Sequence, residues 1–438
     1  GGDPDREGQL LVDEVLDYLG NEKPVRRILI NALDDKSIHD ALGDLRDNRD
    51  FLPLKRSALA RARADWLIGM NLSRAYTLAA RRAGHDRLVL PIGRVKTPTL
   101  ALVVRREREI ESFKPATYYL LDAVFRHEKS GESFHARWKP SEGRTPLDPE
   151  GRLVDEKAAR AALESFGGAP QDAQITRYER KKKEEPPPLP FSLSALQVLA
   201  GKRYGYEPQQ VLDTAQKLYE EKLTSYPRSD AEYLPVSQHK DAPKILGNLA
   251  ALDGSELSAW AREADAKQKS RAWNDAKISA HHAIIPTTVP VNLARLSEME
   301  RNIYGLIARA YIAQFHPNYV YDQTKVEVTY HGELFAASGR TERAAGWRAM
   351  YRTGKSETED AEKEDEESAV LPPMKKGDAA NYVSADLSTR QTKPPSRFTP
   401  ATLLQGMKEI HKYVKDEAAK KMLRDVSGIG TEATRASI

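Results

Sequence analysis

The segment Leu223–Asp230, with the sequence Leu-Thr-Ser-Tyr-Pro-Arg-Ser-Asp, contains the side chains best suited to covalent chemistry. A tyrosine phenol has a pKa of about 10, so Tyr226 needs help to act as a nucleophile at neutral pH. Arg228 could stabilise both phenolate character and the charge of an attacked phosphate. A tyrosine phosphodiester would keep roughly the energy of the bond it replaces, which makes cleavage reversible without ATP. Taken alone, the segment favours the simpler interpretation of a core tyrosine beside a surface arginine.

A second candidate is the acidic turn Asp3-Pro4-Asp5-Arg6-Glu7-Gly8. Alternating carboxylates on an extended segment point the same way, and Asp3, Asp5 and Glu7 together offer the oxygen ligands that Mg²⁺ prefers. Water and substrate phosphate would complete the octahedron. The alternative interpretation is a solvated acidic surface.

Two glycine-containing turns could hold phosphate. Arg94 and Lys96 lie in Ile92–Thr99, just before a helix expected to begin at Pro98 with Thr97 as its N-cap, and free N–H groups there suit an anion. Thr431 caps a similar turn within Ser427–Arg435. Either turn could instead be a plain helix cap.

Two further stretches complete the candidates. His281 or His282 could bind a phosphate or donate a proton, but further zinc ligands are lacking nearby, so a structural pair is the alternative. The segment Phe191–Gln197 opens a helix with Ser192, Ser194 and Gln197, which suit contacts to nucleic acid. The helix expected over 207–221 and the strand-like Leu223–Ser225 suggest a winged-helix arrangement.

The elements that must position these residues follow from hydrophobic periodicity. Residues 9–19 predict a helix with Leu11, Val15 and Leu19 on one face, followed by a short buried strand over 27–32, as in the βαβ start of an α/β domain. Residues 36–112 predict helices. The long helix expected over 56–82 offers five residues for burial: Leu59, Trp66, Leu67, Met70 and Tyr76.

The rest of the chain alternates. Residues 116–180 favour strands, 181–190 a charged, proline-stiffened connector, and 191–315 helices. Strands return over 319–330, 333–338 and 347–351, and a last helical part begins at Phe398. This order predicts a nested chain path, in which a central domain is inserted between two halves of a β-rich module.

Composition sets broad limits. The 438 residues suffice for roughly three domains. Cysteine is absent, which excludes disulfides and thiolate chemistry within these residues. The formal net charge of the chain is +4. The segment 357–368 carries eight acidic residues and one lysine, a net charge of −7, so the other residues together carry a net charge of +11. A basic body with an acidic loop fits a polyanionic partner, although an ordinary charged surface fits as well. A cytoplasmic location without a transmembrane helix is expected.

The motifs occur in one order: DPDREG, PIGRVKTPTLALVVRRE, PFSLSALQ, LTSYPRSDAEYLP, AHHAIIPT and GIGTEATRASI. In this combination the chain resembles the type IA DNA topoisomerases, in particular the bacterial topoisomerase III group with its plasmid-borne forms. The resemblance covers nearly the whole chain except the acidic loop.

The resemblance implies a multidomain α+β fold: a torus with a partial Toprim α/β domain, helical domains, a winged-helix-like catalytic domain and a β-rich arch. It implies that Tyr226 becomes linked to a 5′ phosphate, that Arg228 stabilises the scissile phosphate, and that His281 and Glu7 belong to the active site. Asp3, Asp5 and Glu7 would hold Mg²⁺, and the partner would be single-stranded or underwound DNA bound by a monomer. The contacts to DNA would be Arg94, Lys96, Ser192, Ser194, Gln197 and Thr431.

The expected domains are given by residue range. They are the C-terminal part of Toprim, 1–35; a helical DNA-binding domain, 36–115 and 396–438; a β-rich arch or hinge domain, 116–185 and 318–395; and the winged-helix-like domain, 186–317. The family also has a Glu and a Lys on its first Toprim strand, and the chain begins after them. We therefore expect an internal piece of a longer enzyme that binds single-stranded DNA but cleaves it poorly.

Three rival functions stay open at this point. A non-catalytic winged-helix DNA-binding protein would explain the basic helices but not the acidic turn. A Toprim nuclease or primase would use the carboxylates without Tyr226. A reverse gyrase core is a third alternative, although the chain contains no helicase motif.

Overall fold

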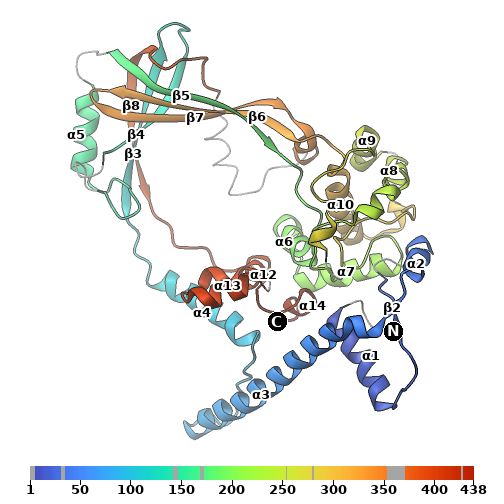
Figure 1. Ribbon diagram of the computed structural model, residues 1–438. Helices are drawn as coiled ribbons and strands as arrows, with labels where there is room; N and C mark the ends of the chain where they lie inside the picture. The colour runs from blue at the N-terminus through green and yellow to red at the C-terminus, as the bar shows by residue number, and fades with distance from the viewer. Residues whose placement is uncertain are drawn as a thin grey trace. The chain divides into compact units, whose positions relative to one another are not determined.

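The computed structural model describes residues 5–30, 35–141, 147–167, 172–252, 254–278, 281–352, 370–425 and 428–438. Asp3 and the acidic segment 357–368 lie outside these residues. The chain forms two compact units of mixed helix and sheet, so the fold is multidomain α+β (Figure 1). Unit 1 contains residues 1–107, 187–316 and 397–438, and unit 2 contains residues 108–186 and 317–396. No helix within the described residues is long and apolar enough to cross a membrane.

Unit 1 begins with helix α1 (Arg6–Tyr18), whose N-cap Asp5 accepts a hydrogen bond from the Gly8 amide at 2.7 Å. The helix packs against α3 (Leu52–Arg82) and buries Gln9 and Asp13. The predicted helix is therefore confirmed, but its apolar face is not the packed one. The predicted face of Leu11, Val15 and Leu19 is exposed.

The buried strand predicted over 27–32 is wrong for the described part. Only β1 (Arg26–Arg27) is a strand, and it pairs antiparallel with β2 (Arg46–Asp47), whereas 28–30 have no regular structure and 31–34 lie outside the described residues. Helix α2 (Asp35–Leu42) and the 3-10 helix η1 (Asn48–Phe51) complete this part. The described strands here are too short to form the parallel sheet of a βαβ unit.

The long basic helix is confirmed as α3, but its predicted burial is wrong. Trp66, Leu67, Met70 and Tyr76 are each about half exposed or more, and Ala58 is the buried residue of α3 among those described. An extended segment accompanies the helix, since Ile92 N donates to Ser73 Oγ at 2.8 Å and Leu90 N to Thr77 Oγ1 at 3.0 Å. Helix α4 (Lys96–Glu111) begins at Lys96 rather than Pro98.

The helices predicted over 191–315 are confirmed. They are α6 (Leu193–Tyr204), α7 (Pro208–Glu220), η2 (Val236–Asp241), α8 (Ala242–Ala250), α9 (Glu256–Glu263), η3 (Asp275–Lys277), η4 (Leu293–Arg295) and α10 (Glu298–Ala313). Helix α10 contacts α6, α7 and α9 and buries both of its tyrosines, Tyr304 and Tyr311, so it is the centre of this packing.

The C-terminal helices of unit 1 are α12 (Pro400–Lys408), η6 (Ile410–Tyr413), α13 (Glu417–Asp425) and the short α14 (Glu432–Arg435). Helix α12 packs against α6 so closely that a Cβ on Gly201 would lie 2.8 Å from the Ala401 side chain. Met407 on α12 and Leu102 on α4 share a small apolar cluster. The C-terminal segment is thereby fixed beside α6.

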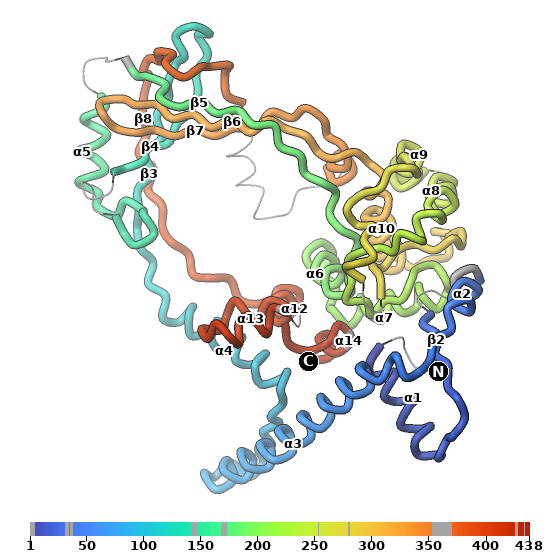
Figure 2. Tube along the Cα trace, in the orientation of Figure 1, coloured from blue at the N-terminus to red at the C-terminus, as the bar shows by residue number. Residues whose placement is uncertain are grey.

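Unit 2 is a closed antiparallel barrel in the order β3-β4-β7-β6-β5-β8. Its strands are β3 (Thr117–His127), β4 (Ser133–Lys139), β5 (Asp172–Glu185), β6 (Tyr319–Tyr330), β7 (Glu333–Ala344) and β8 (Ala379–Gln391). The trace in Figure 2 shows that strands far apart in sequence, such as β5 and β6, lie side by side. The barrel is therefore assembled from the two halves of the chain that flank residues 187–316.

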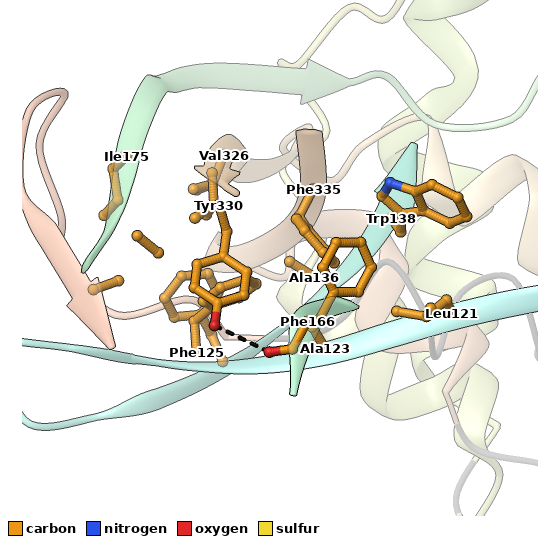
Figure 3. Close-up of a cluster of buried hydrophobic side chains, with 14 of the residues drawn as sticks. Leu121, Ala123, Phe125, Ala136, Trp138, Phe166, Ile175, Val326, Tyr330 and Phe335 are labelled. Carbon is orange, nitrogen blue, oxygen red and sulfur yellow. Dashed lines mark hydrogen bonds between the residues drawn. The ribbon is translucent and has the colours of Figure 1, made fainter. Parts of the chain in front are cut away.

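An aromatic cluster fills one end of the barrel (Figure 3). The ring centroid of Phe335 lies 5.2 Å from that of Phe125 and 5.1 Å from that of Phe166, and both pairs meet edge to face. The Tyr330 hydroxyl donates to the Phe166 carbonyl at 3.1 Å. Phe166 comes from α5 (Glu156–Phe166), a helix that we did not predict within the β-rich region.

Two other predictions for unit 2 are wrong. The charged connector expected over 181–190 is in part strand, because β5 continues to Glu185. The strand expected over 347–351 is the 3-10 helix η5 (Gly346–Tyr351). The strand predicted over 319–330 is confirmed as β6, and β7 extends to Ala344, beyond the predicted end at Ser338.

Candidate active site

A helix end places Tyr226. The amide of Lys222 donates to the Tyr219 carbonyl and the amide of Leu223 to the Leu218 carbonyl, both at 2.9 Å, which is the Schellman pattern that ends α7. The residue in the left-handed position is Lys222, with φ of 64°, where glycine is the usual occupant. The chain turns there and enters the segment that carries the tyrosine.

Backbone pairing then fixes the segment 223–226 against 283–287. The Ser225 amide donates to the Ile285 carbonyl at 2.9 Å, and the Thr287 amide donates to the Leu223 carbonyl at 3.1 Å. Ile284 continues the pairing, since its amide donates to the Phe191 carbonyl at 2.8 Å. The same contacts therefore hold the tyrosine segment, the start of α6 and the histidine segment together.

Tyr226 is buried, with 3% of its surface exposed. Its ring stacks on the His281 ring, with centroids 5.1 Å apart and planes at 29°, and meets Tyr219 edge to face at 5.8 Å. The structure thus brings together two residues, Tyr226 and His281, that are far apart in sequence. Arg228 follows the buried Pro227 and is partly exposed.

Asp230 is the acidic partner of His281. His281 Nδ1 lies 3.6 Å from Asp230 Oδ1, and this contact with the imidazole holds the pKa of the Asp230 carboxyl below its ordinary value. The other nitrogen, Nε2, is buried and has no hydrogen-bond partner among the residues that the structure describes. A proton on Nδ1 would face the carboxylate and leave Nε2 for a ligand.

His282 has a different role from its neighbour. Its Nδ1 lies 2.8 Å from the Ala283 carbonyl and its Nε2 lies 3.0 Å from Gln238 Nε2, which fits a neutral ring with the proton on Nδ1. Burial lowers the pKa of His282 to about 4. His282 is therefore a neutral, structural histidine.

The start of α6 is tied to the C-terminal segment. The Ser194 amide donates to Glu432 Oε2 at 2.6 Å, the Ser194 hydroxyl contacts the same oxygen, and Arg435 Nη1 donates to Glu432 Oε1 at 2.6 Å. Glu432 and Arg435 are both buried. The carboxylate thus satisfies a free amide in the first turn of α6 and is itself neutralised by the arginine.

The other predicted contacts on α6 are also engaged within the protein. Ser192 caps the helix and its hydroxyl donates to Glu232 at 3.1 Å, while the Gln197 amide donates to the Pro208 carbonyl at 2.9 Å. Both residues are fully buried. These side chains position α6.

The basic loop and the glycine-rich turn are more accessible. Arg94 makes a bidentate contact with Asp65, at 2.6 and 3.0 Å, and Lys96 is exposed at the start of α4. Thr431 is half-buried and caps α14 by exchanging hydrogen bonds with Thr434. Gly428 has φ of 92°, and a Cβ there would lie 2.4 Å from the Met407 carbonyl oxygen, so this turn requires glycine.

The acidic turn is described only in part, because Asp3 lies outside the described residues. Asp5 Oδ1 is the helix cap, and Glu7 Oε1 accepts from Arg6 at 3.0 Å and Arg61 at 2.8 Å. Each of these carboxylates keeps a second oxygen, and oxygen donors fit Mg²⁺ in chemistry. Within the described ranges, however, no three His, Asp or Glu side chains converge on one point.

Sequence reasoning missed three contributors to this site. Asp230 lies in the tyrosine motif but was given no role, and Tyr219 lies in the helix expected over 207–221, where nothing in the sequence singles it out. Glu432 lay in the glycine-rich turn, but its contact with Ser194 joins residues far apart in sequence. No local signal identifies such a contact.

The chain matches the family model described as DNA topoisomerase over residues 51–438. It is 45% identical to DNA topoisomerase 3 of Vibrio cholerae and 44% identical to DNA topoisomerase 3 of Salmonella typhimurium, in both cases over 100% of this chain. These alignments cover 67% and 66% of the relatives, so the chain spans about two thirds of their length.

The solved structure of full-length topoisomerase I from Thermotoga maritima has a similar fold. Its TM-score is 0.68 at 21% identity, over 99% of this chain and 64% of that one. The family match and the relatives agree with the family that the order of the motifs indicated. The chain belongs to the type IA DNA topoisomerases, which are isomerases, and is like bacterial topoisomerase III.

Proposed function

We propose that Tyr226 is the nucleophile that breaks and rejoins one DNA strand through a 5′-phosphotyrosine link, without ATP. The observation that carries the proposal is the stack of Tyr226 on His281, at 5.1 Å, on a segment fixed by backbone pairing. A phenol held in one orientation beside an imidazole and two residues from a guanidinium meets the requirements of an activated nucleophile.

The proposed step conserves atoms and charge. The Tyr226 oxygen attacks the phosphorus, the bond from phosphorus to O3′ breaks, and the phenolic proton is transferred through the site to the departing O3′. Rejoining is the reverse attack by the 3′ hydroxyl. Strand passage between the two steps would relax negative supercoils and decatenate DNA.

His281 and Arg228 would share the work at the phosphate. Nε2 of His281 is the buried ring nitrogen that a phosphate oxygen or a transferred proton would meet, and Asp230 orients the ring. Arg228 would offset the charge that develops on the attacked phosphate. Asp3, Asp5 and Glu7 would hold Mg²⁺, which supplies further positive charge at a phosphate.

The partner would be DNA, mainly single-stranded or underwound. Lys96 is exposed and Thr431 and Arg94 are partly exposed, so these three would touch the strand directly, with Arg94 exchanging Asp65 for a phosphate. We propose that three buried side chains, Ser192, Ser194 and Gln197, shape the wall of the site before they make any contact with DNA. The enzyme would act in the bacterial cytoplasm on nucleoid or plasmid DNA.

The test is Tyr226→Phe with Tyr219→Phe as the matched control, since the two rings lie 5.8 Å apart. The substitutions are made in the full-length enzyme, which is incubated with Mg²⁺ and an oligonucleotide labelled at its 3′ end, because a 5′-phosphotyrosine retains the downstream piece. We expect Tyr226→Phe to bind DNA and form no labelled adduct, while Tyr219→Phe forms it. An adduct in Tyr226→Phe, or transfer of a 5′ label instead, would refute the assignment. Binding without any tyrosine-dependent adduct would favour a non-catalytic DNA-binding protein.

A further inference from the structure

Strand β5 of the barrel carries a run of cations, Arg180 to Lys183, whose members alternate between the two faces of the sheet. On one face, the charges are neutralised. Arg180 and Arg343 both contact the buried carboxylate of Asp322, at 2.6 and 2.8 Å, and Lys182 lies 2.7 Å from Glu184. This face therefore has no unmatched positive charge on β5.

The opposite face differs. Lys181 pairs across the sheet with Gln323, and Glu179 with Lys325, so residues from β5 and β6 form one patch. Glu179 is already shared by Lys181 and Arg177. Lys183 and Lys325 are exposed, and no ion pair of either is found among the described residues. Two lysines on this face thus lack a counter-charge.

These residues surround a hollow. A depression of about 100 Å³ is lined by Lys181, Lys183, Lys325, Gln323 and Glu179. Since one water occupies about 30 Å³, the volume suits about three waters or one small oxyanion. The carboxylate of Glu179 is paired with Lys181, so the ammonium groups of Lys183 and Lys325 and the Gln323 amide remain as donors, and the hollow favours an anion.

We propose that this hollow on the barrel binds a phosphate of the DNA backbone. DNA as the source of the phosphate rests on the proposed function. Residues i and i+2 of a strand are roughly 6.6 Å apart, so Lys181 and Lys183 could contact neighbouring oxygens or neighbouring phosphates. Arg340 extends the basic face, since it lies opposite Gln323 on β7 and over the Tyr321 ring at 4.9 Å.

The test compares Lys183→Gln/Lys325→Gln with the control Lys182→Gln in the whole chain. The control removes the same type of charge from the same strand, but on the face where it is paired with Glu184. Binding of a long single strand and a long linear duplex is measured without Mg²⁺ at several salt concentrations. The binding constant K falls as salt rises, and each lost phosphate contact makes the plot of log K against log salt concentration less steep by about 0.7–0.9.

Because the hollow holds one phosphate, we expect the steepness of this plot to fall by roughly 0.7–0.9 in the double variant, so that its affinity decreases roughly threefold less than that of the original protein between about 50 and 200 mM salt. Lys182→Gln should keep the original slope. An unchanged double variant, or an equal change in the control, would overturn the proposal. Binding of inorganic phosphate is measured on the same proteins. If phosphate binds the original protein and not the double variant, while both proteins bind long DNA with the same salt dependence, the site takes free phosphate and the proposal fails.

The two proposals fail separately. Equilibrium binding needs no covalent step, so it is informative even if Tyr226 is not the nucleophile. Conversely, adduct formation by the full-length enzyme on a short oligonucleotide should persist in Lys183→Gln/Lys325→Gln, because neither lysine contacts Tyr226, His281 or Asp230 among the described residues. Loss of both DNA binding and adduct formation would indicate a folding defect. Thermal melting of the double variant distinguishes such a defect from a specific loss of the phosphate site.

Discussion

His282 should make the tyrosine site sensitive to acid. The ring is buried and accepts a hydrogen bond from Gln238 at Nε2, so a second proton at this nitrogen would remove the bond and place a charge in an apolar site. Burial lowers its pKa to about 4, whereas an unfolded histidine titrates near 6.5. As the pH falls, His282 is therefore protonated in the opened state at a higher pH than in the folded state.

The size of the effect follows from the two pKa values. Because the folded pKa is the lower one, stability is complete above about pH 6.5, decreases as the pH falls, and reaches its full loss below about pH 4. A shift of about 2.5 units corresponds to about 3 kcal/mol, of which about 2 kcal/mol is lost by pH 5. A loss of this size would release the pairing of 283–285 well before the rest of unit 1.

Hydrogen exchange of the Ala283, Ile284 and Ile285 amides measures this opening, since each amide donates a hydrogen bond within the paired segments. We expect protection, corrected for intrinsic exchange, to fall between pH 6.5 and 4 in the original chain and to stay level in His282→Gln. His39→Gln, at an exposed histidine on α2, is the control and should keep the slope. An identical slope in His282→Gln would refute the argument.

Two further substitutions test the packing. Gly428→Ala forces a left-handed alanine against the Met407 carbonyl and should destabilise the C-terminal segment by at least about 2 kcal/mol, which is measured as faster hydrogen exchange of the Ile429 amide. The control Gly205→Ala has a similar φ but open space around the new Cβ, so it should destabilise the protein by only about 1 kcal/mol. Equal destabilisation by the two substitutions would contradict the clash at Gly428. Phe166→Ala should destabilise unit 2 by about 3–5 kcal/mol in thermal melting, and a shift of less than 1 kcal/mol would show that α5 does not support the barrel core.

The sequence predicted those elements whose signals are local. Residues 319–330 mostly alternate between buried and partly buried positions, and the strand was found with its correct ends. The long helix α3 was found from its periodicity and the glycine that follows it. Strand β8 was not located, because little of its alternating pattern is apolar and only Ala380 of it is fully buried.

Burial was less predictable than secondary structure. Periodicity shows that one face of a helix is apolar, but not whether anything packs against it, and α3 and α1 expose faces that were expected to be buried. The site shows the same limit. Tyr226, Arg228 and His281 were nominated from motifs and their order, whereas the ring stack, the Asp230 contact and the Glu432 contact depend on tertiary pairing that no short segment specifies.

The closure of the barrel also has a consequence for biosynthesis. Strand β3 pairs with β8, so Asp122 lies opposite Asp386. The chain between these two residues contains most of the protein. During synthesis, β3, β4 and β5 leave the ribosome long before β6, β7 and β8, so their edges are open while residues 187–316 fold. Pairing over such sequence distances is slow. Early termination of translation anywhere before β8 would therefore leave a sheet with exposed edges, which makes truncated chains prone to aggregation.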